Sequence, residues 1–151
     1  HVRRLAKAGF AGSSAIDERF DPSLPAALLN RDAFVQVLLN LVRNAVEAGA
    51  ERITLSSAYR PGIAVSAGEG RARQPLPIEI CVSDDGPGVP ADIADHLFDP
   101  FVSGRPEGKG LGLALVDKLV GQMGGIVQHS REGERTMFRV LLARAREEMT
   151  A

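Results

Sequence analysis

The sequence predicts an α+β domain in which helices cover one face of a mixed β-sheet. Helical and strand-like patterns alternate along the 151 residues, as expected for a sheet packed against helices. The last two strand-like stretches, "GGIVQHS" and "TMFRVLLAR", are separated only by the turn "REGER", which predicts a hairpin. Because a hairpin is antiparallel and the earlier elements alternate, we expect strands of both directions in one sheet.

Two long helices follow from apolar side chains spaced at 3.6 residues. The first begins near Ala33 and ends at Gly49. Its apolar stripe consists of Phe34, Val37, Leu38, Leu41, Val42, Ala45 and Ala48. The second runs from Leu111 to Met123, and a short helix is expected around Ile93 to Leu97.

Strands are expected at "RITLSSAY", residues 52–59, and within "PIEICVSDDG", residues 77–86. In the second, Ile78, Ile80 and Val82 alternate with Glu79, Cys81 and Ser83, which is typical of a half-buried strand. Residues 60–75, rich in Gly, Pro and charge, are interpreted as a long loop. Residues 1–20 carry scattered charge and a Gly-Ser patch, so we interpret them as a linker with room for an edge strand, and 21–151 as the folded domain.

The composition is that of an ordinary globular domain, 44% apolar and 25% charged with a net charge of -1. This balance argues against a nucleic-acid partner. Cys81 is the only cysteine, which excludes an intramolecular disulfide and favours a reducing compartment. No stretch has the length of a membrane span and no signal peptide opens the chain, so we expect a cytoplasmic protein without membrane contact.

The stretch "GRPEGKGLGLAL", residues 104–115, combines four glycines with an arginine and a lysine ahead of a helix. Backbone amides at such a place can bind an anion. A phosphate-binding P-loop needs four residues before its Gly-Lys pair and then Ser or Thr, whereas three residues separate Gly104 from Gly108 and Gly110 follows the lysine. The glycine spacing also differs from the dinucleotide fingerprint. The stretch alone is therefore either an anion-binding loop of another kind or a flexible turn.

Polar residues form a line along the first helix, because Gln36, Asn40 and Asn44 are four residues apart. Asparagine is a poor helix former, so two of them in mid-helix suggest a use. An amide oxygen can coordinate Mg²⁺, which prefers oxygen ligands. A solvated helix face that happens to contain asparagine is the equally good alternative.

The stretch "SDDGPGVP" places Asp84 at the end of an apolar strand, followed by Gly86 and Gly88. The pattern fits a tight turn in which Asp and Gly satisfy backbone geometry. It also fits a carboxylate that accepts a hydrogen bond from an exocyclic amine, with glycines that let a flat ring approach the chain. The pattern by itself does not separate these two interpretations.

Together, "QVLLNLVRNAVEA", "DDGPGVP", "LFDPFVSGRPEGKGLGLAL" and "RTMF" resemble the N box, first glycine box, F box, second glycine box and last conserved segment of the ATP-binding catalytic domain of sensor histidine kinases. The resemblance covers roughly residues 21–145. "PFVSGRPEGKGLGL" is most similar to the bacterial nitrogen-regulation (NtrB-type) sensor kinases. The resemblance implies the two-layer α/β sandwich of histidine kinase, gyrase and chaperone ATPases (Bergerat fold), with ATP and Mg²⁺ as cofactors.

On the base side, the resemblance implies that Asp84 binds the adenine amino group and that Gly86 and Gly88 flank the base. Thr136 matches a threonine near the adenine. These four residues are therefore expected to bind the nucleoside.

On the phosphate side, the resemblance implies that Asn44 holds Mg²⁺ and that Asn40 and Arg105 lie near the phosphates. A lid that binds phosphates through its amides at a helix N-terminus would consist of Gly110, Leu111, Gly112 and Leu113. Lys109 replaces a residue that is often small in this box, and we expect it to contact phosphate. Phe98 and Phe101 are either apolar anchors of this lid or ordinary core residues.

Related ATPases of the gyrase, chaperone and mismatch-repair kind share these boxes but usually carry a glutamate four residues before the magnesium asparagine. Asn40 occupies that position here, and an amide is no general base near neutral pH. An anti-sigma-type kinase or a regulatory module without catalysis is a further alternative. The F box and the long lid favour the histidine kinase.

Sensor kinases carry their phosphoacceptor histidine in a motif like H-E-x-x-N-P-L, and neither His1, His96 nor His129 lies in such a motif. The resemblance therefore implies that the acceptor belongs to a separate dimerisation domain, which residues 1–20 would follow. It also implies a response regulator as a partner through that domain.

Overall fold

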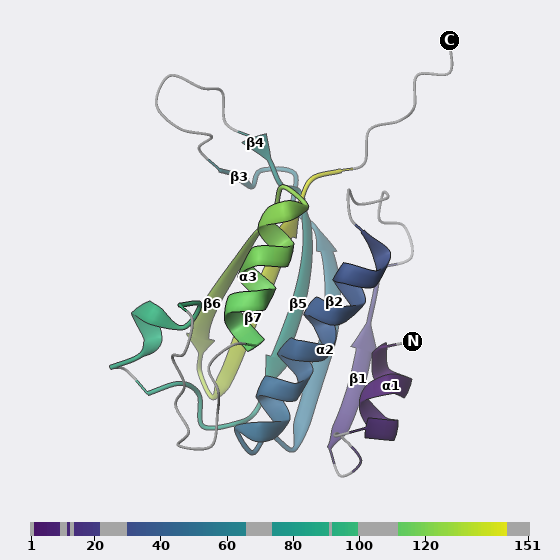
Figure 1. Ribbon diagram of the computed structural model, residues 1–151, viewed down its shortest axis with the longest axis vertical. Helices are drawn as coiled ribbons and strands as arrows, with labels where there is room; N and C mark the ends of the chain where they lie inside the picture. The colour runs from purple at the N-terminus through teal and green to yellow at the C-terminus, as the bar shows by residue number, and fades with distance from the viewer. Residues whose placement is uncertain are drawn as a thin grey trace.

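The central sheet has five strands in the order β1-β2-β5-β7-β6 (Figure 1). Their bounds are Ala15–Arg19 (β1), Arg52–Tyr59 (β2), Ile78–Asp84 (β5), Ile126–Glu132 (β6) and Arg135–Leu142 (β7). The computed structural model describes residues 2–9, 12, 14–21, 30–65, 74–90, 92–99 and 112–144. β1 runs parallel to β2, and the other neighbouring strands are antiparallel. The predicted mixed sheet and its terminal hairpin are confirmed.

Helices lie on one face of this sheet. The described helices are α1 (Val2–Gly9), α2 (Arg31–Glu47) and α3 (Gly112–Gln122), with a 3-10 turn η1 at Ala94–His96. Figure 1 shows α2 and α3 side by side across the strands, and the two helices contact each other. The expected two-layer α+β architecture is therefore confirmed, and its apolar core lies between these helices and the sheet.

Helix α2 begins two residues before the predicted start, because Asn30 caps it. The Asn30 side-chain oxygen accepts a hydrogen bond from the Ala33 amide at 3.1 Å, which satisfies one of the free amides of the first turn. The helix ends just before Gly49, whose φ of +92° favours glycine. The predicted apolar stripe is buried at Val37, Leu38, Leu41, Val42 and Ala45.

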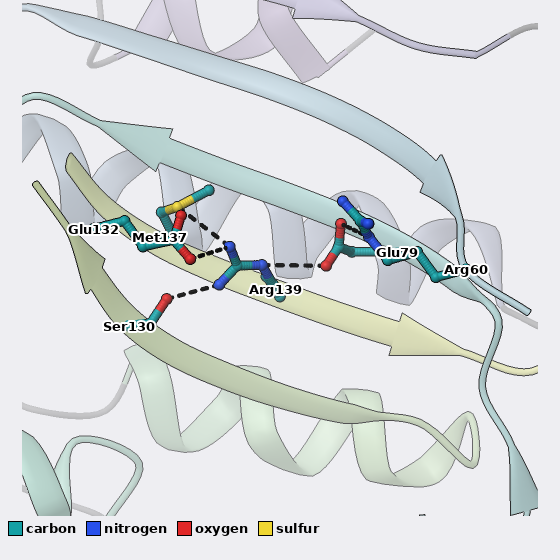
Figure 2. Close-up of polar contacts among 6 residues, drawn as sticks. All are labelled: Arg60, Glu79, Ser130, Glu132, Met137 and Arg139. Atoms are coloured by element: carbon teal, nitrogen blue, oxygen red, sulfur yellow. Dashed lines mark hydrogen bonds and ion pairs between the residues drawn. The ribbon is translucent and has the colours of Figure 1, made fainter. Parts of the chain in front are cut away.

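Strand β5 is buried on both faces, so the prediction of a half-buried strand is wrong. Its apolar residues face the helices, but Glu79, Cys81 and Ser83 are also buried. β5 lies in the middle of the sheet between β2 and β7, and the arginines Arg60 and Arg139 lie against Glu79 (Figure 2). Long arginine side chains from neighbouring segments therefore shield this face in place of a helix.

Residues near the N-terminus have regular structure. The possible edge strand is present as β1, and its Ile16 is buried in the core. Helix α1 was not predicted; it contacts α2 and buries Ala6 completely. Within the loop predicted at 60–75, Ala64–Val65 (β3) and Gln74–Pro75 (β4) form a two-stranded ladder. No helix in the described ranges is long and apolar enough to cross a bilayer.

Candidate functional site

Asp84 and Thr136 face each other at one end of the sheet. Asp84 is the last residue of β5, Thr136 is its partner in β7, and each is only 3% exposed. The Asp84 Oδ1 atom accepts a hydrogen bond from the Gly86 amide at 2.8 Å. The structure thus brings together a buried carboxylate and a buried hydroxyl that the sequence places 52 residues apart.

Burial raises the pKa of Asp84 above the usual aspartate range. The Gly86 hydrogen bond and the nearby guanidinium groups of Arg131 and Arg135 act in the opposite direction, and the Asp85 carboxylate adds to the rise. The charged form of Asp84 is therefore incompletely compensated by the protein. A ligand that donates a hydrogen bond to this carboxylate would supply what the protein does not.

The two glycines after Asp84 allow close packing around it. A Cβ atom at Gly86 would lie 2.8 Å from Asp84 Oδ1, which real side chains do not tolerate. Gly88 has a φ of +83°, and a Cβ atom there would lie 3.1 Å from Arg131 Nη1 and 3.3 Å from Thr136 Oγ1. Gly88 therefore favours glycine because of its backbone conformation, whereas a side chain at Gly86 would displace the Asp84 carboxylate.

Arg131 completes this cluster, although it lies in none of the site motifs of the sequence. Its Nη1 atom donates to the Gly86 carbonyl oxygen and to Thr136 Oγ1, both at 2.7 Å. Arg131 pairs with Thr136 in the β6–β7 ladder, so Asp84, Thr136 and Arg131 form one row across three strands. The predicted hairpin turn "REGER" included Arg131, whereas the structure places Arg131 in β6 as the ladder partner of Thr136.

Asp85, the second aspartate of "SDDG", holds the loop from the other side. Its Oδ1 atom accepts hydrogen bonds from the Glu51 amide at 2.9 Å and the Arg52 amide at 3.0 Å. The Arg52 amide is the main cause of a lowered pKa of Asp85. The loop after β5 is thus joined to the turn between α2 and β2.

The asparagines of α2 lie one helical turn apart, and both are half-buried. Gln36 Nε2 donates to Asn40 Oδ1 at 3.0 Å. The side-chain amide of Asn44 has no hydrogen-bond partner among the residues that the structure describes. In those residues there is also no group of three His, Cys, Asp or Glu that could hold a metal ion.

Comparison with known proteins decides the family. Residues 29–146 match the family described as histidine kinase-, DNA gyrase B-, and HSP90-like ATPases. The chain belongs to this family. It is 54% identical over 146 residues to the sensory histidine kinase/phosphatase NtrB of Rhizobium leguminosarum bv. phaseoli. That alignment covers 94% of this chain and 38% of the relative, so the chain spans well under half of the relative's length.

Solved structures of histidine kinases share this ATPase fold. The catalytic domain of histidine kinase ThkA, in a nucleotide-free form, superposes with a TM-score of 0.70 at 23% identity, covering 93% of this chain and 88% of that one. Full-length ShkA in complex with AMPPNP gives a TM-score of 0.65 at 29% identity, covering 95% of this chain and 30% of that one. The predicted likeness to histidine kinase catalytic domains, and to NtrB-type kinases in particular, is confirmed.

Part of the predicted phosphate side of this ATPase domain lies outside the described residues. This applies to Arg105, Lys109, Gly110, Leu111 and Phe101. Gly112 and Leu113 begin α3, and Leu113 packs against the core. Phe98 packs edge-on against buried Phe138, with ring centroids 6.2 Å apart, which fits the core interpretation of this residue.

Two of the three histidines lie within the described residues, and they differ in exposure. The Nε2 atom of His129 is buried without a hydrogen-bond partner among the described residues, and its ring lies 5.1 Å from that of Phe138. Burial lowers the pKa of His129, which favours the neutral form of the ring. His96 forms an exposed pair with Asp99 at 3.2 Å.

Proposed function

We propose that this chain is the ATP-binding catalytic domain of an NtrB-type sensor histidine kinase that acts in nitrogen regulation. In this proposal it holds ATP with the γ-phosphate directed at a histidine of a separate dimerisation domain. The observation that carries the proposal is the buried carboxylate of Asp84, which lies opposite Thr136 and is followed by Gly86 and Gly88. This arrangement can recognise the edge of one purine base.

Adenine suits the carboxylate because its exocyclic amine is a hydrogen-bond donor. Guanine carries a carbonyl oxygen at that position, so two acceptors would meet in a buried place. Leaving such a carboxylate unpaired costs about 2 to 3 kcal/mol, or roughly a hundredfold in affinity. Asp84 thus favours ATP over GTP, while Gly86 and Gly88 let the ring approach the chain.

Asn44 fits the role of the protein ligand to Mg²⁺. Its amide oxygen is a hard ligand, its side chain is half-buried, and no described residue engages the amide. Mg²⁺ commonly takes only one or two protein ligands besides phosphates and water. When bound, the ion neutralises charge on the phosphates.

Asn40 favours transfer to histidine over hydrolysis by water. It occupies the position of the general-base glutamate of the hydrolysing relatives, and its Oδ1 already accepts from Gln36. An amide cannot take a proton from water near neutral pH. Imidazole is itself a nucleophile, so the task left to this domain is to position ATP and to stabilise charge. Arg105, Lys109 and the lid residues 110–113 complete the phosphate side of the proposal.

The partners follow from the relatives. NtrB is named a sensory histidine kinase/phosphatase, and the ShkA structure is described as a complex with AMPPNP, which supports a nucleotide site in this chain. We therefore propose the dimerisation domain of the same kinase and, through it, a response regulator as partners. Cys81 is buried as a free thiol, which suits the reducing cytoplasm.

Labelled ATP tests the proposal directly. The chain is incubated with Mg²⁺ and γ-labelled ATP, alone and with separately produced dimerisation helices of an NtrB-type kinase. We expect neither label nor rapid phosphate release from the chain alone, and a labelled histidine on the added helices. Rapid phosphate release by the chain alone would instead favour the hydrolase. Label on His96 or His129 would show that the acceptor lies in this chain.

A further inference from the structure

We propose that Arg131 fixes the direction of the Thr136 hydroxyl, so that this hydroxyl donates a hydrogen bond to the N1 atom of adenine. Arg131 is then a positioning residue for base recognition that acts through Thr136. The inference rests on the proposed function, because it concerns the same adenine site.

The geometry comes from a single nitrogen atom. Arg131 Nη1 donates to both the Gly86 carbonyl oxygen and Thr136 Oγ1, at 2.7 Å each. The first contact anchors the guanidinium to the loop after Asp84, and the second joins it to β7. The hydroxyl is thus held by a guanidinium group that is itself anchored to the Gly86 carbonyl oxygen.

A guanidinium group donates hydrogen bonds and accepts none. The Thr136 hydroxyl has one proton, and its oxygen is the acceptor in the contact with Arg131. The proton must therefore point away from Arg131, toward another acceptor. Without Arg131, the hydroxyl could rotate and serve either as a donor or as an acceptor.

Adenine offers a matching acceptor. On its pairing edge, the exocyclic amine is a donor and the adjacent ring N1 is an acceptor. Asp84 and Thr136 face each other in the ladder, so they present an acceptor beside a donor. Guanine and hypoxanthine carry the reverse pattern, a carbonyl oxygen beside an N1–H. The row Asp84–Thr136–Arg131 is therefore complementary to adenine at two atoms: Asp84 accepts from the exocyclic amine, and Thr136 donates to N1.

Gly88 preserves the contact between Arg131 and Thr136. A Cβ atom at this position would lie within 3.3 Å of both Arg131 Nη1 and Thr136 Oγ1. Thr136 and Arg131 thus lie directly against the glycine that is proposed to flank the base. The hydroxyl is accordingly on the side of the row that faces Gly88.

The test compares ATP with 1-deaza-ATP, in which a C–H group replaces N1 and the amine is unchanged. Dissociation constants are measured by calorimetry for wild type, Arg131→Met, Arg131→Lys and Arg135→Met. Wild type should prefer ATP by about tenfold, as expected for one neutral hydrogen bond. Arg131→Met should reduce this preference to within about twofold. Arg131→Lys should retain most of it, because one nitrogen atom makes both contacts.

Arg135→Met is the matched control. Arg135 begins β7 in the same hairpin, but it donates to Ser83 and Thr54 on the opposite sheet face. This variant should keep the tenfold preference. A loss of preference in Arg135→Met equal to that in Arg131→Met would overturn the inference, since it would show that hairpin damage alone causes it.

Further outcomes also decide the matter. An unchanged preference in folded Arg131→Met, or no preference for N1 in a wild type that binds ATP, overturns the inference and leaves the proposed function standing. A wild type that binds neither nucleotide overturns the proposed function. If Arg131→Met does not fold, Thr136→Val serves instead: it should lack the N1 preference, and retention of the preference would overturn the inference.

Discussion

Glu79 of β5 and Arg139 of β7 form an ion pair on the sheet face opposite the helices, with 3.1 Å between Oε1 and Nε (Figure 2). The Glu79 side chain is 8% exposed and that of Arg139 is 22% exposed. Arg139 also donates to Ser130 and to Glu132, and Glu79 also pairs with Arg60. This network fills the face that no helix covers in the described part of the molecule.

Glu79→Ala should lower the free energy of unfolding by about 2 kcal/mol, because it leaves a largely buried guanidinium without its buried partner. Urea denaturation of the nucleotide-free protein measures this cost. Glu132→Ala is the control, because Glu132 accepts from the same arginine but its own side chain is 59% exposed. It should cost less than about 0.5 kcal/mol. Equal losses in the two variants would contradict the assigned role of burial.

Asp84→Asn should stabilise the nucleotide-free protein at pH 7. Burial raises the pKa of Asp84, so this group stabilises the fold fully below its ordinary pKa and loses that contribution as the pH rises through the raised value. Asparagine still accepts from the Gly86 amide but carries no charge. Thermal unfolding at several pH values should show a gain at pH 7 that disappears at acid pH, together with a loss of ATP binding.

Asp85→Asn should destabilise the protein at pH 7, in contrast to Asp84→Asn. The pKa of Asp85 is lowered, chiefly by the Arg52 amide, so its charged form stabilises the fold above its ordinary pKa. That contribution is lost as the pH falls through the lowered value. The variant should therefore melt below wild type at pH 7 and converge with it in acid. Parallel pH profiles for the two aspartate variants would refute the assignment of opposite pKa shifts to Asp84 and Asp85.

Gly88→Ala should destabilise the fold more than Gly133→Ala. Both glycines have positive φ, which costs a side chain about 1 kcal/mol, but a Cβ atom at Gly133 would meet nothing within 4 Å. At Gly88 it would press against Arg131 and Thr136. Chemical denaturation and ATP titration should show an additional cost and weaker binding only for Gly88→Ala. Equal behaviour of the two variants would argue against close packing at Gly88.

Asn44→Ala should remove the Mg²⁺ dependence of ATP binding and leave the melting temperature within about 2 °C of wild type. Its side-chain amide has no partner among the described residues, so its loss breaks no described hydrogen bond. Titrations with and without Mg²⁺ measure the effect. Gln36 lies on the same face of α2, two turns before Asn44. The control variant Gln36→Ala should retain the Mg²⁺ dependence of ATP binding. An unchanged dependence in Asn44→Ala would assign the ion to another ligand.

Periodicity was sufficient to predict α2, α3, β5 and the hairpin, because each has a long amphipathic or alternating pattern. It did not predict α1, a helix of only eight residues that contacts α2. The alternating pattern of β5 also wrongly predicted that its face with Glu79, Cys81 and Ser83 is exposed. The arginines that bury Glu79 come from distant positions, and a local pattern carries no information about them.

In the site, too, local motifs revealed some residues and missed one whose role depends on its neighbours in the fold. Asp84, Gly86, Gly88, Asn44 and Thr136 stand out within recognisable motifs, although their functional roles remain predictions. Arg131 lies in no such motif, and its importance depends on which side chains the hairpin register places beside it. Arg131 and Thr136 are only five residues apart, but they become neighbours only once the exact length of the hairpin turn fixes the register.

The hydrogen bonds of Asp85 make two turns depend on one another, although 33 residues or more separate their members in the chain. A residue inserted after Ala48 or after Asp85 would pull one turn away from the other. The β6–β7 turn at Gly133 carries no described contact of this kind. Insertions and deletions among homologues should therefore be rare at the first two turns and common at the third. The length of a turn can change only where no hydrogen bond ties it to another turn.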